Sequence, residues 1–170
     1  MHPAETEIGM NRLTALAVAT CLAGPAAAQS VVVGIGYTDF GASAADDQAV
    51  FSLEYHHTPF YRAARLAIGV GGALSLHEDG GTDLGLGIVG TYDLERNWFL
   101  EASVMPGVYW ETGIGNDLGG EFQIRSLLGV GYTFENDNSV SLAVTHISNA
   151  GTNNFNPGAN SLLLRYSIAF

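Results

Sequence analysis

Residues Thr82 to Asp93 read TDLGLGIVGTYD, and their pattern indicates the fold class. Apolar residues occupy one parity, whereas small or polar residues occupy the other. The first set is Leu84, Leu86, Ile88 and Tyr92, and the second is Asp83, Gly85, Gly87 and Thr91. Because side chains alternate between the two faces of a β-strand, this stretch predicts a strand with one apolar face.

The same period of two recurs along the chain, between segments rich in Gly, Asn and Asp. We expect strands at Val31–Phe40, Gln48–His57, Ala63–Leu74, Thr82–Asp93, Trp98–Trp110, Gly120–Glu135, Ser139–Ser148 and Ser161–Phe170. Alternating segments of about ten residues are typical of barrels that cross a membrane. The sequence therefore predicts an all-β fold, an eight-stranded antiparallel transmembrane β-barrel.

The inward parity of four expected strands carries Gly-x-Gly, as in Gly129-Val130-Gly131. A narrow barrel filled by side chains needs small residues on that face, with Gln123 and Arg125 also inside. A secreted sandwich is the rival fold, but it would not usually carry this motif within four strands. Aromatic residues near strand ends are expected at the membrane interfaces, namely Trp98, Tyr109, Trp110, Tyr132 and Phe134.

Longer and shorter connections alternate, which predicts long loops outside the cell and both termini in the periplasm. Residues 1–28 are predicted to comprise upstream residues and a secretory signal peptide, and residues 29–170 the barrel. The signal comprises the charge of Arg12, an apolar run over Leu13–Leu22 and a small-residue cleavage site before Gln29. Thr20 disfavours a lipoprotein signal at Cys21, because a small residue is expected at that position.

Cys21 is the only cysteine of the 170 residues, so the barrel has neither a disulfide nor a thiolate nucleophile. The chain contains no lysine and carries a formal net charge of -11. This balance argues against binding to nucleic acid, which requires a basic surface. The histidines at His56, His57 and His77 form no convincing metal site.

A polar pair, His146 and Ser148, continues the apolar parity of the seventh expected strand. A histidine two residues from a serine could act as its base, and Asn160 on the neighbouring strand could orient the histidine. The alternative interpretation is an interfacial polar pair, which water and headgroups tolerate at a strand end.

The final segment strengthens the catalytic interpretation. Residues 145–151 read THISNAG, Asn156-Pro157-Gly158 follows, and the last strand ends at Phe170. This segment resembles the C-terminal signature of the PagL-type lipid A 3-O-deacylase family. The resemblance implies that His146 is the base and Ser148 the nucleophile. It also implies an oxyanion hole among Asn149, Gly151 and Asn156.

The family pattern has a glutamate where this chain has Asn160, so the acid of the triad is missing. An amide can orient the histidine, and we expect it to lower activity without abolishing it. The alternative is a non-catalytic barrel, structural, adhesive or lipid-binding, that keeps a degenerate deacylase motif.

The resemblance implies an outer-membrane esterase that removes an acyl chain, at position 3, from lipid A or lipopolysaccharide in the outer leaflet. A phospholipid ester is chemically close. Serine chemistry implies no metal or organic cofactor. The last strand resembles the signal read by the outer-membrane assembly machinery, and the sequence leaves the oligomeric state open.

Overall fold

The structure, a computed structural model, describes residues 29–41, 47–112 and 116–170. The predicted signal peptide, residues 1–28, lies outside them. The described residues form β1 (Ser30–Phe40), β2 (Gln48–His56), β3 (Tyr61–Ala63), β4 (Leu66–His77), β5 (Thr82–Asp93), β6 (Trp98–Trp110), β7 (Phe122–Thr133), β8 (Ser139–Ser148) and β9 (Ala159–Ala169). None of these residues belongs to a helix long and apolar enough to cross a membrane.

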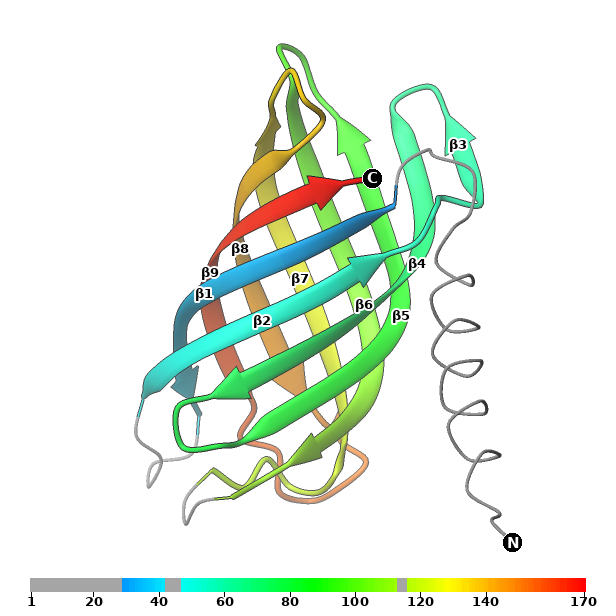
Figure 1. The fold of residues 1–170 in the computed structure, drawn as a ribbon. Coiled ribbons are helices and arrows are strands. Elements are labelled where there is room, and N and C mark those ends of the chain that lie inside the picture. The colour runs from blue at the N-terminus through cyan, green and yellow to red at the C-terminus, as the bar shows by residue number, and fades with distance from the viewer. Residues whose placement is uncertain (1–28, 42–46, 113–115) are drawn as a thin grey trace, which may run out of the picture.

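Eight of the strands close into an antiparallel barrel, as predicted (Figure 1). Strands from β4 to β9 pair in chain order, β9 pairs with β1, and β1 pairs with β2. Pairing of β2 with β4 completes the ring, and β3 is a short strand added to β4. A closed barrel satisfies every backbone hydrogen bond within its wall, as a lipid environment requires.

The expected strands at Thr82–Asp93, Trp98–Trp110 and Ser139–Ser148 match β5, β6 and β8 residue for residue. The third expected strand, Ala63–Leu74, is the largest error. The chain reverses at Ala64, whose φ is 49°, so Tyr61–Ala63 folds back on the start of β4 instead of beginning it.

The outer wall of the barrel is apolar. Leu86 is 70% exposed, Leu128 65% and Ile35 63%, and all three lie on the outward parity of their strands. Exposure of so many large apolar side chains to water would be unfavourable, whereas contact with the hydrocarbon interior of a lipid bilayer is favourable.

The interior is packed with side chains, as the Gly-x-Gly motifs predict. Gln123 and Arg125 are buried inside, as expected. Gly131 lies against the ring of Phe99, and a Cβ at this glycine would collide with that ring. The prediction that Tyr109 belongs to the aromatic girdle is wrong. Its side chain is 2% exposed and points into the barrel, whereas that of its neighbour Trp110 points outward.

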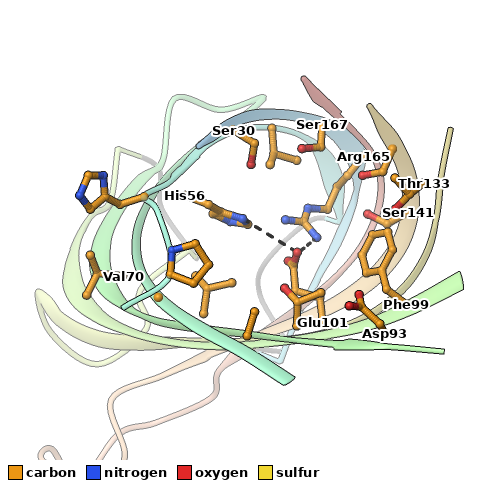
Figure 2. Close-up of a pocket in the computed structure, with 18 of the residues that line it drawn as sticks. Ser30, His56, Val70, Asp93, Phe99, Glu101, Thr133, Ser141, Arg165 and Ser167 are labelled. Atoms are coloured by element: carbon orange, nitrogen blue, oxygen red, sulfur yellow. Dashed lines mark hydrogen bonds and ion pairs between the residues drawn. The ribbon is translucent and has the colours of Figure 1, made fainter. Parts of the chain in front are cut away.

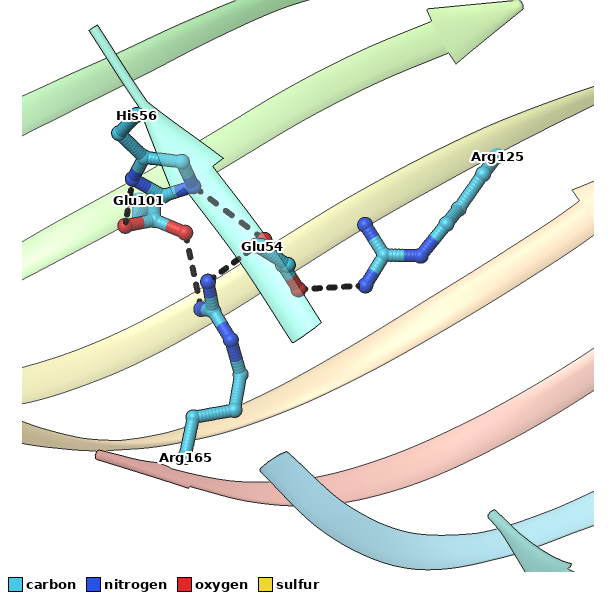
Figure 3. A network of polar contacts seen from close by, with 5 residues as sticks. All are labelled: Glu54, His56, Glu101, Arg125 and Arg165. Carbon is cyan, nitrogen blue, oxygen red and sulfur yellow. Dashed lines mark hydrogen bonds and ion pairs between the residues drawn. The ribbon is translucent and has the colours of Figure 1, made fainter. Parts of the chain in front are cut away.

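A buried ion network crosses the interior (Figure 3). Arg165 donates to Glu54 over 2.9 Å and to Glu101 over 2.8 Å, and Arg125 donates to the other oxygen of Glu54 over 2.7 Å. The Nε2 atom of His56 lies 3.2 Å from Glu54. The charges on strands β2, β6, β7 and β9 therefore pair across the lumen and hold opposite walls together.

We call the two ends of the barrel the loop end and the turn end. The loop end carries the connections β1–β2, β4–β5, β6–β7 and β8–β9, and both Ser30 and Ala169 lie at the turn end. A cavity of about 220 Å³ reaches the ion network from the turn end, between His56, Phe99 and Arg165 (Figure 2). The interior is therefore a short vestibule above a packed core.

Candidate active site on the outer wall

Strand β8 carries the polar pair as its alternation requires. Residues of one parity, Ser141, Ala143, Thr145 and Ile147, are buried in the lumen. Leu142 and Val144 face outward, and His146 follows them on the exposed face. Ser148 ends the strand half-buried on the same parity. The two candidate catalytic residues therefore lie on the outer wall, at the loop end.

The structure brings His146 together with Asn160. These two residues are directly opposite each other in the antiparallel pair β8–β9. The Nδ1–H of His146 donates to the Oδ1 of Asn160 over 2.9 Å. This bond selects the tautomer in which Nε2 is unprotonated and able to accept a proton. Strand β9 begins two residues before the expected Ser161, and Asn160 is therefore held in its ladder.

A buried asparagine organises the loop that follows Ser148. Asn149 is fully buried. Its Nδ2 contacts the carbonyl oxygens of Phe155, Gly119 and Leu118 at 2.8, 3.2 and 3.3 Å. Its Oδ1 accepts the backbone N–H of Gly151 over 2.9 Å. The side chain therefore joins the β8–β9 loop to the β6–β7 loop.

The chain leaves β8 through a tight turn with two left-handed residues. Ala150 has a φ of 53° and Gly151 a φ of 77°. The N–H of Thr152 closes the turn on the carbonyl of Asn149 over 3.0 Å. A non-glycine residue in this region is strained, and strain of this kind gathers at functional sites. The turn leaves Ser148 at the very end of the strand.

The three residues expected in an oxyanion hole have different contacts. The backbone N–H of Gly151 is already hydrogen-bonded to the Oδ1 of Asn149. Asn156 accepts the backbone N–H of Asn149 on its Oδ1 over 3.0 Å. Asn156 is an exposed residue, and its Nδ2 has no hydrogen-bond partner in the described part of the chain. The oxyanion role stays a prediction, and Asn156 has the uncommitted donor.

An apolar plug supports the site from inside the barrel. It comprises Phe40, Tyr109, Leu118, Ile147 and Ala159, all buried. Ile147 lies between His146 and Ser148 in sequence, and Ala159 precedes Asn160. The inward side chains of Ile147 on β8 and Ala159 on β9 are therefore tightly packed. This packing holds the backbone that carries the outward residues His146, Ser148 and Asn160.

Sequence reasoning missed one neighbour of the pair, Ser126 on β7. It is directly opposite His146, and its Oγ donates to the His146 carbonyl over 3.3 Å. The sequence did contain a signal for it, since Ser126 is a polar residue between Ile124 and Leu128 on the apolar parity of this strand.

One cluster in the lumen has donor atoms suited to a metal ion. Ligand atoms of Glu54, His56 and Glu101 lie within 4.8 Å of one another. The guanidinium of Arg165 bonds both carboxylates of this cluster, and its positive charge stands where a cation would balance them. We therefore assign the cluster to the ion network.

Comparison with known proteins assigns the family. The profile described as "Lipid A 3-O-deacylase (PagL)" matches residues 31–169. The lipid A deacylase PagL of Bordetella bronchiseptica (strain ATCC BAA-588 / NCTC 13252 / RB50) is 30% identical over 76 residues. That alignment covers 44% of this chain and 43% of the relative, so it spans less than half the length of the curated protein.

Solved structures share the barrel. The crystal structure of the outer membrane enzyme PagL superposes with a TM-score of 0.66 at 23% identity, covering 83% of this chain and 99% of that one. Neisserial surface protein A gives 0.58 at 14% identity, covering 86% and 100%. A de novo designed transmembrane barrel gives 0.56 at 9% identity, covering 86% and 98%.

These likenesses show the fold alone, since a surface protein and a designed barrel share it. The family match concerns almost the whole barrel, including the hairpin that holds His146 and Asn160. Together with the apolar outer wall, it assigns the barrel to a bacterial outer membrane. The chain belongs to the lipid A 3-O-deacylase (PagL) family.

Proposed function

We propose that this barrel hydrolyses an ester-linked acyl chain of lipid A at its outer wall, at position 3 of the sugar. Ser148 is the nucleophile, His146 the base and Asn160 the group that orients the base. The observation that carries the proposal is the 2.9 Å hydrogen bond from His146 Nδ1 to Asn160 Oδ1, two residues from Ser148 on an exposed apolar wall. Family membership supplies the substrate class.

The reaction divides into two acyl transfers. In the first, Ser148 Oγ attacks the ester carbonyl while Nε2 of His146 takes its proton. The tetrahedral intermediate collapses, the bond to the sugar oxygen breaks, and Nε2 returns the proton to that oxygen. In the second, water deprotonated by Nε2 attacks the acyl-serine, and the fatty acid leaves as the proton returns to Ser148.

Negative charge develops on the carbonyl oxygen in both transfers and requires a hydrogen-bond donor. We assign this role to the Nδ2 of Asn156, at the end of the loop that Asn149 holds. Asn149 and Gly151 then act by fixing the loop in the position that Asn156 needs.

The position of the site on the wall suits a membrane substrate. Leu142 and Val144 continue the outward row below His146 and are 50% and 55% exposed. An acyl chain in the bilayer would lie against this row with its ester near the loop end. Orientation of the reacting groups then requires little extraction of the lipid.

The test is mass spectrometry of lipid A from cells that express the barrel, compared with a Ser148→Ala variant at equal outer-membrane abundance. We expect the loss of one hydroxyacyl chain with the unsubstituted barrel and intact lipid A with the variant. Ser139→Ala is the matched control, because it removes a serine hydroxyl from the same strand at the turn end, away from His146, and should leave activity intact.

Asn160 favours a second candidate, a non-catalytic barrel that keeps the hairpin for structural, adhesive or lipid-binding purposes. Intact lipid A with both the unsubstituted barrel and Ser148→Ala would favour this candidate. Release of fatty acid from phospholipids alone would instead assign a different ester substrate to the same serine.

A further inference from the structure

A row of polar side chains crosses the seam where the first and last strands meet. Asn160 on β9 is directly opposite His146 on one side and Asp39 of β1 on the other. Asp39 is exposed and lies on the outward parity of β1, as His146 and Asn160 do on theirs. A carboxylate therefore stands one strand beyond the amide that replaces the family's glutamate.

Contacts on both sides of Asp39 hold the register of this seam. Thr38 and Ser161 are directly opposite each other, and their buried hydroxyls lie 2.8 Å apart. On the other side, the N–H of Gly41 donates to the carbonyl of Gly158 over 2.9 Å. Slippage of β1 against β9 would break both contacts, so Asp39 stays beside Asn160.

The carboxamide of Asn160 has two ends, and the hydrogen bond to His146 uses one of them. Because Oδ1 is engaged by His146 of β8, Nδ2 is the end left for a partner on β1, where Asp39 lies. Directly opposite residues have Cβ atoms about 4.5–5.5 Å apart, within reach of a hydrogen bond between two short side chains. The Asp39 side chain is exposed and, among the described residues, forms no hydrogen bond to Asn160 or to any other group.

We propose that Asp39 is a positioning residue for catalysis and supplies the negative charge that Asn160 lacks. A rotamer change lets its carboxylate accept an Nδ2–H of Asn160. This bond fixes the amide with Oδ1 toward His146 and increases the negative charge on Oδ1. The row Asp39, Asn160, His146 thereby stabilises the imidazolium that forms when Ser148 loses its proton.

The proposal rests on the proposed hydrolysis, and a kinetic experiment separates the two. The purified full-length barrel is assayed in mixed micelles with lipid A, and the released hydroxy acid is quantified. We expect Asp39→Asn to lower kcat about tenfold with KM changed less than about twofold, because the row acts on the transition state. Asp39→Glu keeps the charge and should retain most of the activity.

Asp47→Asn is the matched control, since it removes an exposed carboxylate from the same end of the barrel, just before β2. Equal rates for Asp39→Asn and Asp47→Asn would overturn the proposal while leaving the hydrolase intact. Absence of Ser148-dependent release from the unsubstituted barrel would overturn the hydrolase itself.

A second background distinguishes positioning from a structural role. In Asn160→Glu the histidine has its own carboxylate, and Asp39 then stands directly opposite a like charge, which is unfavourable. We expect Asp39→Asn to leave kcat unchanged or to raise it in this background. An equal loss in both backgrounds would mean that Asp39 serves folding, and would overturn the proposal.

A spectroscopic measurement keeps the link testable without catalysis. In a ¹⁵N-labelled barrel in micelles, the side-chain NH₂ signal of Asn160 should move with Asp39→Asn and stay fixed with Asp47→Asn. A signal that responds equally to both substitutions would overturn the link between Asp39 and Asn160 whatever the lipid A assay shows.

Discussion

His146 and Asn160 are joined by a single hydrogen bond of 2.9 Å across the β8–β9 pair, on the outer face of the barrel. An amide oxygen at this position sets the histidine tautomer but adds no negative charge. The pair therefore has the contact between histidine and orienting group of a Ser-His-acid arrangement, with a neutral group in the orienting position.

We expect Asn160→Glu to raise kcat about tenfold, because a charge-assisted hydrogen bond is worth about 1 kcal/mol or more beyond a neutral one. The gain is smaller than the loss of about 10⁴ known for acid-to-amide changes in serine proteases, since Oδ1 already selects the right tautomer. Initial rates of acid release measure it. Asn160→Ala should fall below the unsubstituted rate, and a rate unaffected by either change would contradict the role of Asn160.

Asn156→Asp separates the two ends of the proposed oxyanion donor. The aspartate keeps the oxygen that accepts the Asn149 N–H but loses the Nδ2 donor. We expect kcat to fall by about 10²–10³, the usual effect of removing one oxyanion donor. Asn153→Asp adds the same charge to the same loop and serves as control. If both variants have the same rate, Asn156 is not the donor.

Asn149→Ala should release the loop from the barrel. It leaves the carbonyl oxygens of Gly119 and Phe155 without the Asn149 donor, at about 1–3 kcal/mol for each group left unsatisfied, whereas the Leu118 carbonyl keeps the Nε2 donor of Gln123 at 3.2 Å. Limited proteolysis read by mass spectrometry should show cleavage within residues 150–157 and loss of activity, with the barrel intact. Asn154→Ala, on the exposed side of the loop, should change neither. Resistance of the Asn149 variant to cleavage would contradict the role of this side chain.

Arg165→Met tests the ion network. Two buried carboxylates, Glu54 and Glu101, would lose their shared partner, and loss of one member of a buried pair costs about 3–5 kcal/mol. The free energy of unfolding is measured by urea titration in lipid vesicles. Arg65→Met breaks an exposed pair with Glu95, whose atoms are 3.9 Å apart, and should cost at most about 1 kcal/mol. Similar losses for the two variants would mean that the network is not a main source of stability.

Leu128→Arg tests the lipid-facing wall. Leu128 is 65% exposed in the middle of β7, and an arginine near the bilayer midplane costs about 2–4 kcal/mol in a barrel. Glu135→Arg introduces the same side chain in the exposed β7–β8 turn and should be nearly neutral. The same urea titration measures both, and a neutral Leu128→Arg would place this face outside the hydrocarbon.

The sequence predicts the wall well, because period-two alternation is local. The parity of β8 predicts that His146 and Ser148 share the outward face with Leu142, and the structure confirms it. Local alternation also explains why Tyr109 points inward. Neighbouring residues in a strand point to opposite faces, and Trp110 points outward. The β3 reversal is missed because a three-residue strand has too few residues to show a period.

Pairings between distant strands are beyond such local reasoning. The contacts of Arg165 with Glu54 and Glu101 join strands 111 and 64 residues apart in the chain. Opposition of Asp39 and Asn160 depends on how the first strand registers against the last, which no segment of sequence specifies by itself. The same holds for Asn149, whose partners Leu118 and Gly119 belong to a different loop.

The β1–β9 pairing also bears on when the site becomes complete during folding. Ser148, His146 and Asn160 all belong to the C-terminal hairpin and come together as soon as β8 and β9 pair. Asp39 belongs to the first strand and joins them only when the ring shuts. If Asp39 acts as proposed, a chain in which β1 and β9 have not yet paired would carry a site without its carboxylate, and full hydrolytic activity would require closure of the ring.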